Sequence, residues 1–183
     1  AILTAPASAL RSTEMLEDLV RDPPEGLDVV IPATRARMAP LLRAYEPDLL
    51  LCNGFPWKIP VDALAVPRLG AVNGHPSLLP KYRGPNPIGR AIRNGETEIG
   101  WTLHRMDADF DTGPILAQKA FPLGYEHSWD ELVPKMADCV SELLPRALEG
   151  SDEIRRQGAG GLQASAGGAG GGPSPADRQP HLR

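Results

Sequence analysis

The chain has 183 residues, 42% of them hydrophobic, and a formal net charge of −4 at neutral pH. This length and composition suit one soluble domain with a buried core, and no apolar run approaches the roughly 18 residues of a membrane-spanning helix. Residues 150–183 carry four arginines against three acidic residues, so residues 1–149 carry −5, which argues against a surface built mainly for binding nucleic acid.

The first residues, Ala1-Ile2-Leu3-Thr4, include no initiating Met and no basic-then-apolar layout of a signal peptide. We interpret them as the interior of a strand and expect the amino terminus to be incomplete. The cysteines, Cys52 and Cys139, lie far apart in apolar surroundings and match neither a disulfide framework nor a zinc spacing. They indicate reduced core residues of a cytoplasmic protein.

Short apolar runs alternate with helical patterns along residues 1–149, which is typical of a parallel sheet flanked by helices. The candidate strands are residues 2–3, 27–31, 49–52, 70–73, 99–103 and 115–120. One helical face follows Ser12 and Thr13, and another helix over residues 87–93 is closed by Asn94-Gly95. The pattern predicts an α/β fold with a Rossmann-like, open, mostly parallel sheet.

The strongest helical pattern covers residues 128–148, where Ser128 and Glu131 form a capping box ahead of an apolar stripe. Pro134 and Pro145 interrupt it, so we expect a kink or a broken first turn. Beyond Gly150 the chain is rich in Gly, Ala and Pro and has few large apolar residues. We therefore predict one domain over residues 1–149 and a flexible tail over residues 150–183.

Two polar segments follow predicted strands. The first runs from Asn73-Gly74-His75 to Pro87, and two residues that are two apart in an extended strand point to the same side. An amide and an imidazole placed together can both donate to an oxygen, as in an oxyanion site. The second segment, residues 106–114, holds three carboxylates, and one of them near His75 would favour the protonated imidazole.

Each feature also has a structural interpretation, because Asn-Gly and Asp-Thr-Gly are common in turns and a single His is more often structural. His104 continues the alternation of its strand, His127 precedes a helix, and His181 lies in the tail. No two of these side chains have the spacing of metal ligands, so we expect no metal site.

Together the two segments are similar to the formyltransferase family, in the runs Asn73-Gly74-His75-Pro76-Ser77-Leu78-Leu79-Pro80, Tyr82-Arg83-Gly84 and Met106-Asp107-Ala108-Asp109-Phe110-Asp111-Thr112-Gly113-Pro114-Ile115-Leu116. The resemblance covers roughly residues 27–148. It implies the formyltransferase fold without its first strand and helix, and transfer of a formyl group from 10-formyltetrahydrofolate, a co-substrate, to an amine. Gly74 stands where that family usually carries a β-branched residue.

By the same resemblance, Asn73, His75 and Asp111 are the expected catalytic residues. The residues expected to bind the folate are Cys52, Asn53, Gly54, Phe55, Ser77, Leu78, Leu79, Pro80, Met106, Asp107, Ala108, Asp109 and Phe110. The mechanism that it implies keeps His75 cationic beside Asp111 and uses no metal.

The acceptor amine is the less determined half of the reaction. The motifs are most similar to the methionyl-tRNA formyltransferase branch, which makes initiator methionyl-tRNA the first expectation. The alternatives are a small amine such as an aminosugar nucleotide, an amino acid derivative or glycinamide ribonucleotide, a formyltetrahydrofolate hydrolase, and an inactive folate-binding module. No feature of the sequence predicts an oligomeric state.

Overall fold

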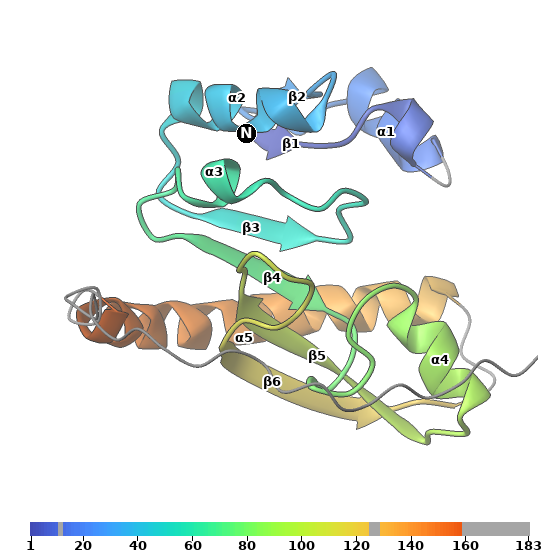
Figure 1. Ribbon diagram of the computed structural model, residues 1–183. Helices are drawn as coiled ribbons and strands as arrows, with labels where there is room; N and C mark the ends of the chain where they lie inside the picture. Colours follow the sequence, from blue (N-terminus) through green and yellow to red (C-terminus); the bar gives the residue numbers. More distant parts are fainter. Residues whose placement is uncertain (11–12, 125–128, 159–183) are drawn as a thin grey trace, which may run out of the picture.

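A computed structural model describes residues 1–10, 13–124 and 129–158, and its elements are labelled in Figure 1. The strands are β1 (Ile2–Leu3), β2 (Val29–Val30), β3 (Leu50–Asn53), β4 (Ala71–His75), β5 (Glu98–Arg105) and β6 (Ile115–Pro122). The helices are α1 (Glu14–Arg21), α2 (Met38–Tyr45), α3 (Val61–Leu64), α4 (Pro87–Arg93) and α5 (Trp129–Gly158), with short 3-10 turns at Ala7–Ala9 and Arg35–Arg37.

The strands form two sheets. β1 pairs with β2 in parallel, and a separate sheet has the order β3-β4-β5-β6. Within that sheet β3 and β4 are parallel, whereas β4, β5 and β6 pair antiparallel. The α/β class with a helix-flanked, open sheet is confirmed, but the sheet is mixed rather than mostly parallel. The last two strands run antiparallel because a loop, with no crossover helix, joins them.

Among the residues that the structure describes, the two sheets are joined by the packing of side chains. Leu3 of β1 and Leu50 of β3 pack against one cluster, whose buried members are Met38, Ala39, Leu42, Cys52, Ile59 and Ala63. No ladder connects β1 to β3 in the described residues, so the strands lie in two sheets.

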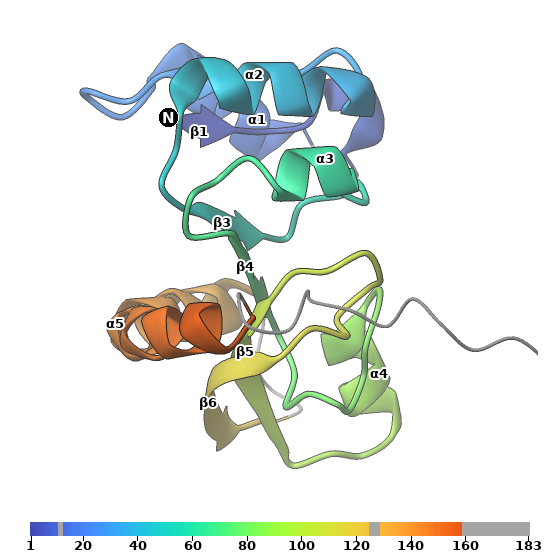
Figure 2. The ribbon, with the colours of Figure 1, turned by 60° about the vertical axis from the view of Figure 1, so that its left-hand side comes forward.

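Helices cover both faces of the larger sheet. Figure 2 shows α5 and α4 on opposite sides of it, and β5 between them is buried from Ile99 to His104. Continuous burial along one strand requires cover on both faces. The main core joins β4, β5, α4 and α5 through Val72, Ile88, Ala91, Ile99, Trp101, Leu103, Leu123, Leu132, Met136, Cys139, Leu143 and Ala147.

Helix α4 matches its predicted bounds, with Pro87 at its first turn and Gly95 at a φ of 71° after its end. Helix α5 differs from the prediction, since it is helical through both Pro134 and Pro145 and continues to Gly158. The broken first turn is therefore not found. Both prolines are exposed, and we infer that burial of the opposite stripe outweighs the hydrogen bonds they remove.

The composition change near Gly150 does not end the helix, so the first residues of the expected tail belong to α5. Ser128 of the expected capping box and residues 159–183 lie outside the described residues.

Candidate active site

Strand β4 supplies the first two polar side chains of the site. Asn73 and His75 stand two apart on this strand, and His75 is only 5% exposed. Gly74 between them has no room for a side chain, because a Cβ there would lie 2.8 Å from the indole ring of Trp101. The formyltransferase family, which the sequence resembles, usually has a β-branched side chain at this position. Here the ring of Trp101 from β5 fills that space, so the backbone between the two polar residues is packed.

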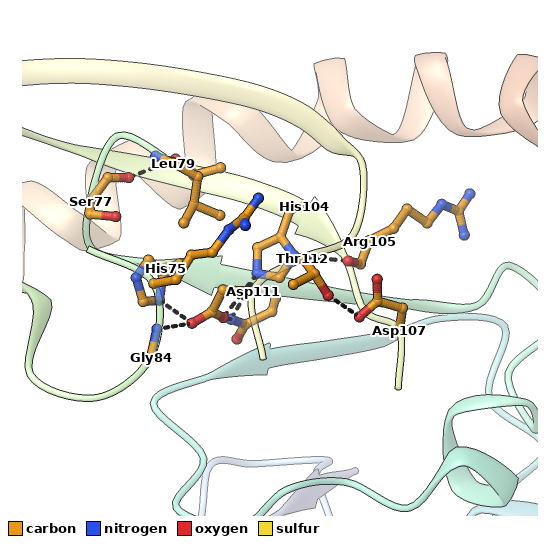
Figure 3. Close-up of polar contacts among 12 residues, drawn as sticks. His75, Ser77, Leu79, Gly84, His104, Arg105, Asp107, Asp111 and Thr112 are labelled. Atoms are coloured by element: carbon orange, nitrogen blue, oxygen red, sulfur yellow. Dashed lines mark hydrogen bonds and ion pairs between the residues drawn. The ribbon is translucent and has the colours of Figure 1, made fainter. Parts of the chain in front are cut away.

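Asp111, in the loop between β5 and β6, lies at the centre of the site (Figure 3). Its Oδ2 accepts a hydrogen bond of 2.7 Å from the backbone N–H of Gly84 and lies 3.4 Å from Nδ1 of His75. Its Oδ1 lies 3.3 Å from Nδ2 of Asn73 and 3.3 Å from Nε2 of His104. The structure therefore brings together the three residues that the sequence singled out.

His104 is a fourth member that sequence reasoning missed. Its Nε2 lies 3.1 Å from Nδ2 of Asn73, and its Nδ1 donates to the backbone carbonyl of Arg105 over 2.8 Å. With a hydrogen at Nδ1, Nε2 accepts from the Asn73 amide when the ring is neutral, and it donates to Asp111 only when the ring carries a second hydrogen. The signal that could have found it is the antiparallel register of β4 and β5, which sets Asn73 opposite His104.

The protonation of His75 follows from its two neighbours. Nε2 lies 3.0 Å from the carbonyl oxygen of Tyr82, and because a carbonyl only accepts, Nε2 carries a hydrogen. Nδ1, which faces Asp111, therefore carries a second hydrogen only when the ring is cationic.

Burial lowers the pKa of His75 below its usual value, and this outweighs the hydrogen bond to Tyr82 and the charge of Asp111, which both act to raise it. The expectation that Asp111 keeps the free protein's His75 cationic is therefore wrong. Desolvation of a charged imidazole in this interior exceeds the attraction of one carboxylate.

Asp111 is held as a carboxylate. Burial alone would raise its pKa, but hydrogen bonds from His104 and Gly84, together with the charges of both histidines, bring the pKa below its usual value. Its backbone has a φ of 55°, a left-handed conformation that aspartate, like asparagine, adopts more readily than most residues. Contacts from four residues, Gly84, His75, Asn73 and His104, hold the side chain in this position.

The loop that carries Asp111 is fixed at both ends. Oδ1 of Asp107 accepts from the backbone N–H of Asp109 and from the hydroxyl of Thr112. At the other end, Gly113 passes so close to β5 that a Cβ on it would lie 2.0 Å from the carbonyl oxygen of Arg105.

We expect Gly113→Ala to lower the free energy of unfolding by about 1–3 kcal/mol, because the added methyl group would push the loop away from β5. Chemical denaturation measures this change. Ala120→Ser, at an exposed position of β6, is the control, and its free energy of unfolding should stay within about 0.5 kcal/mol of wild type. Wild-type stability in Gly113→Ala would show that the loop can move freely.

Two of the three segments predicted to bind folate lie together. Phe55, after β3, and Met106, after β5, pack against the same cluster. Nζ of Lys58 lies 3.6 Å from Asp109 and 5.5 Å from the ring centre of Phe110, whose side chain is 60% exposed. An exposed aromatic ring beside a strand end suits contact with a flat heterocycle.

Within these segments the exposed residues are Asn53, Gly54, Asp107, Ala108, Asp109 and Phe110. Cys52 is 92% buried beside the Met38 cluster, and burial raises the pKa of its thiol to about 11. Cys52 therefore stays protonated and unreactive at neutral pH.

The third predicted segment, residues 77–80, turns inward. Ser77 is fully buried and donates to the carbonyl of Lys81, while Leu79 is 5% exposed. Thr102 and Gln118 bond to the backbone of this segment from β5 and β6. The side chains of Ser77 and Leu79 thus support the loop, Pro80 is exposed and Leu78 half-buried, and folate contact by this segment stays a prediction.

Within residues 1–10, 13–124 and 129–158 no group of three or more His, Cys, Asp or Glu side chains is placed to hold a metal ion. What the site offers is a carboxylate, two imidazoles and an amide at the end of a strand. Such a set can donate to a developing negative charge and transfer protons.

Comparison with known proteins shows which family the chain is similar to. The model of the family described as Formyl transferase matches residues 32–148. The chain is 45% identical over 107 residues to a methionyl-tRNA formyltransferase of Synechococcus sp., covering 58% of this chain and 33% of that protein. It is 41% identical over 109 residues to the protein of the same name from Trichlorobacter lovleyi, covering 60% of this chain and 34% of that protein. The chain thus spans about a third of the length of these relatives.

Solved structures share the fold. The glycinamide ribonucleotide transformylase 1 of Geobacillus kaustophilus superposes with a TM-score of 0.61 at 26% identity, over 81% of each chain. HypX of Aquifex aeolicus, solved in complex with tetrahydrofolic acid, gives a TM-score of 0.62 at 23% identity, over 83% of this chain and 26% of that one.

Proposed function

This chain belongs to the formyl transferase family, and we propose that it transfers a formyl group from 10-formyltetrahydrofolate to an acceptor amine, with Asn73, His75 and Asp111 as its catalytic residues. The single observation that carries this proposal is the Asp111 carboxylate, which contacts both Asn73 and His75 at the end of a central strand.

The reaction is an acyl transfer. The amine nitrogen bonds to the formyl carbon, the carbonyl oxygen becomes an oxyanion, and the bond from that carbon to the folate nitrogen then breaks. We expect His75 to take up a proton from solvent at Nδ1 as the oxyanion forms, because the negative charge of the oxyanion offsets the desolvation that holds the ring neutral in the free protein. His75 Nδ1–H and the Asn73 amide would then donate to the oxyanion. In the free protein the Asn73 amide bonds to His104 and Asp111, so one of these two hydrogen bonds must break when the amide donates to the oxyanion.

Asp111 would transfer the protons of the reaction. The attacking amine loses a proton, and the leaving folate nitrogen gains one. A carboxylate held ionised at the site, with its pKa lowered, can take up the first proton directly or through a water and return it to the leaving nitrogen.

The folate would lie against the exposed segments after β3 and β5, where Phe55 and Phe110 offer aromatic surface and Gly54 leaves the backbone open. Family membership and the likeness to a fold that binds tetrahydrofolic acid in HypX support this placement.

For the acceptor we propose methionyl-tRNA, because the relatives above carry that name at 41% and 45% identity. A small amine is the second candidate. It is favoured by the likeness to glycinamide ribonucleotide transformylase 1, which extends over 81% of that chain.

A formyl-transfer assay with radiolabelled 10-formyltetrahydrofolate tests the proposal on methionyl-tRNA, an aminosugar nucleotide and glycinamide ribonucleotide. We expect label on methionyl-tRNA. Label on a small amine alone would replace the acceptor but keep the reaction. Release of formate without any acceptor would indicate a hydrolase, and folate binding without turnover would overturn the enzymatic function.

If tRNA is the acceptor, we expect weak binding that salt reduces further, because residues 1–149 carry a net charge of −5. Arg83 and Arg93 are exposed on the segments that follow β4. Two to three phosphate contacts would weaken binding by about 10- to 40-fold between 50 and 200 mM salt.

A filter-binding titration measures how steeply the logarithm of the binding constant falls with the logarithm of the salt concentration. Arg83→Gln and Arg93→Gln should each reduce this slope by about the amount expected for one phosphate contact. Arg68→Gln, an exposed arginine in the loop that precedes β4, is the matched control and should leave the slope unchanged. Tight binding that persists at high salt would contradict this expectation and reveal a different binding surface.

No helix in the described part of the chain is both long and apolar enough to cross a membrane.

A further inference from the structure

Tyr82 contacts His75 through its backbone. Its carbonyl accepts the hydrogen of His75 Nε2 over 3.0 Å, and its own φ is 60°, a left-handed conformation. An isolated tyrosine avoids this conformation, which costs about 1–3 kcal/mol. Other contacts must therefore hold the residue in place.

The Tyr82 side chain supplies these contacts on the far side of the loop. Its hydroxyl donates to Oε1 of Glu96 over 2.7 Å and accepts from Nδ2 of Asn94 over 3.1 Å. The guanidinium of Arg90 lies 5.6 Å from the ring centre, in the range of a cation–π contact. The phenol is thus fixed to the end of α4 and to the segment that leads into β5.

This anchor determines how His75 meets a substrate. With the Tyr82 carbonyl in place, Nε2 must carry its hydrogen and Nδ1 is the nitrogen left to face Asp111. If the carbonyl moved away, the ring could turn or take the other tautomer, and the group presented to a reacting oxygen would change.

We propose that the hydrogen bond between Tyr82 and Glu96, called the clamp below, holds the Tyr82 carbonyl at Nε2 of His75. The clamp thereby selects Nδ1 as the nitrogen that faces the formyl group. Tyr82 and Glu96 are both positioning residues for the proposed formyl transfer, on which this inference rests. Glu96 is suited to the role because its carboxylate accepts the hydrogen bond of the phenol over 2.7 Å.

The clamp has a measurable effect on the titration of His75. The charged groups that act on His75 are Asp111 from the β5–β6 loop, His104 from β5 and Arg90 from α4, and the Tyr82 carbonyl adds a hydrogen bond that raises its pKa. Loosening that bond leaves the charge of Asp111 alone to oppose burial, His104 and Arg90, so the pKa of His75 should fall further.

The test compares Tyr82→Phe and Glu96→Gln with Lys81→Gln. Tyr82→Phe removes only the hydroxyl. Lys81→Gln removes the exposed partner of the same Glu96 without touching the phenol, and is the matched control. Nitrogen-15 NMR of labelled histidine reports the tautomer and titration of His75 in the protein without substrate.

We expect Tyr82→Phe to move the His75 titration to lower pH and to mix its tautomers, with a smaller change in Glu96→Gln and none in Lys81→Gln. In the transfer assay Tyr82→Phe should reduce kcat by about tenfold, which corresponds to the loss of one hydrogen bond, and KM for the folate should be nearly unchanged. An unchanged His75 titration in Tyr82→Phe overturns the clamp, as does a loss of thermal stability without any change in His75.

Failure of the proposed function would look different. A wild-type protein that transfers no formyl group would refute the function, whereas the NMR titration needs no turnover and still decides whether Tyr82 and Glu96 set the state of His75.

Discussion

Asp111→Asn is expected to fold and to bind folate while turnover falls by about 10²- to 10⁴-fold. The oxygen of the new amide can still accept from the backbone N–H of Gly84 over 2.7 Å, so the loop keeps this anchor, and the bond that is lost is the longer one of 3.3 Å from Asn73. The new amide cannot take up a proton from the amine. It also removes the negative charge that favours a cationic His75.

Steady-state rates, with circular dichroism and folate binding as checks, measure the effect. Asp62→Asn, an exposed aspartate in the first turn of α3, is the control and should turn over at the wild-type rate. If Asp111 were only a turn residue, Asp111→Asn would be nearly harmless, and near-normal turnover would refute the assignment.

His75→Ala is expected to reduce turnover by about 10²- to 10³-fold, the usual cost of losing one donor to an oxyanion. His75 is 5% exposed and its ring reaches both Asp111 and the Tyr82 carbonyl, so Ala also leaves a hole beside them. His75→Gln fills part of that space and keeps an N–H donor, and we expect it to recover part of the lost rate.

The comparison separates catalysis from packing. Equal losses in His75→Ala and His75→Gln, together with equal falls in melting temperature, would indicate that His75 serves the fold alone.

Much of the fold was predictable because local patterns determine it. All six strands lie within a few residues of the predicted ranges, and α4 ends at Asn94-Gly95 as the sequence indicated. The positions of Asn73 and His75 at the end of a strand followed from alternation alone. Their proximity to Asp111 followed from the family resemblance, since no local pattern links residues that far apart.

Features that depend on pairing between distant segments were not predictable in this way. His104 read as an ordinary strand residue until the register of β4 and β5 placed it opposite Asn73. The charge of His75 depends on its burial, which spacing does not reveal. The broken first turn expected at the prolines of α5 is absent, because a local rule does not include the stabilisation from the buried face of the helix.

The measurement that tests the central claim most directly is the formyl-transfer rate of wild type, Asp111→Asn, His75→Ala and the double variant, each shown to be folded. Because these residues act as one unit through a shared contact, the double variant should be within about threefold of the slower single variant. Losses that multiply, as they do for independent groups, would contradict a common catalytic unit built on the Asp111 carboxylate.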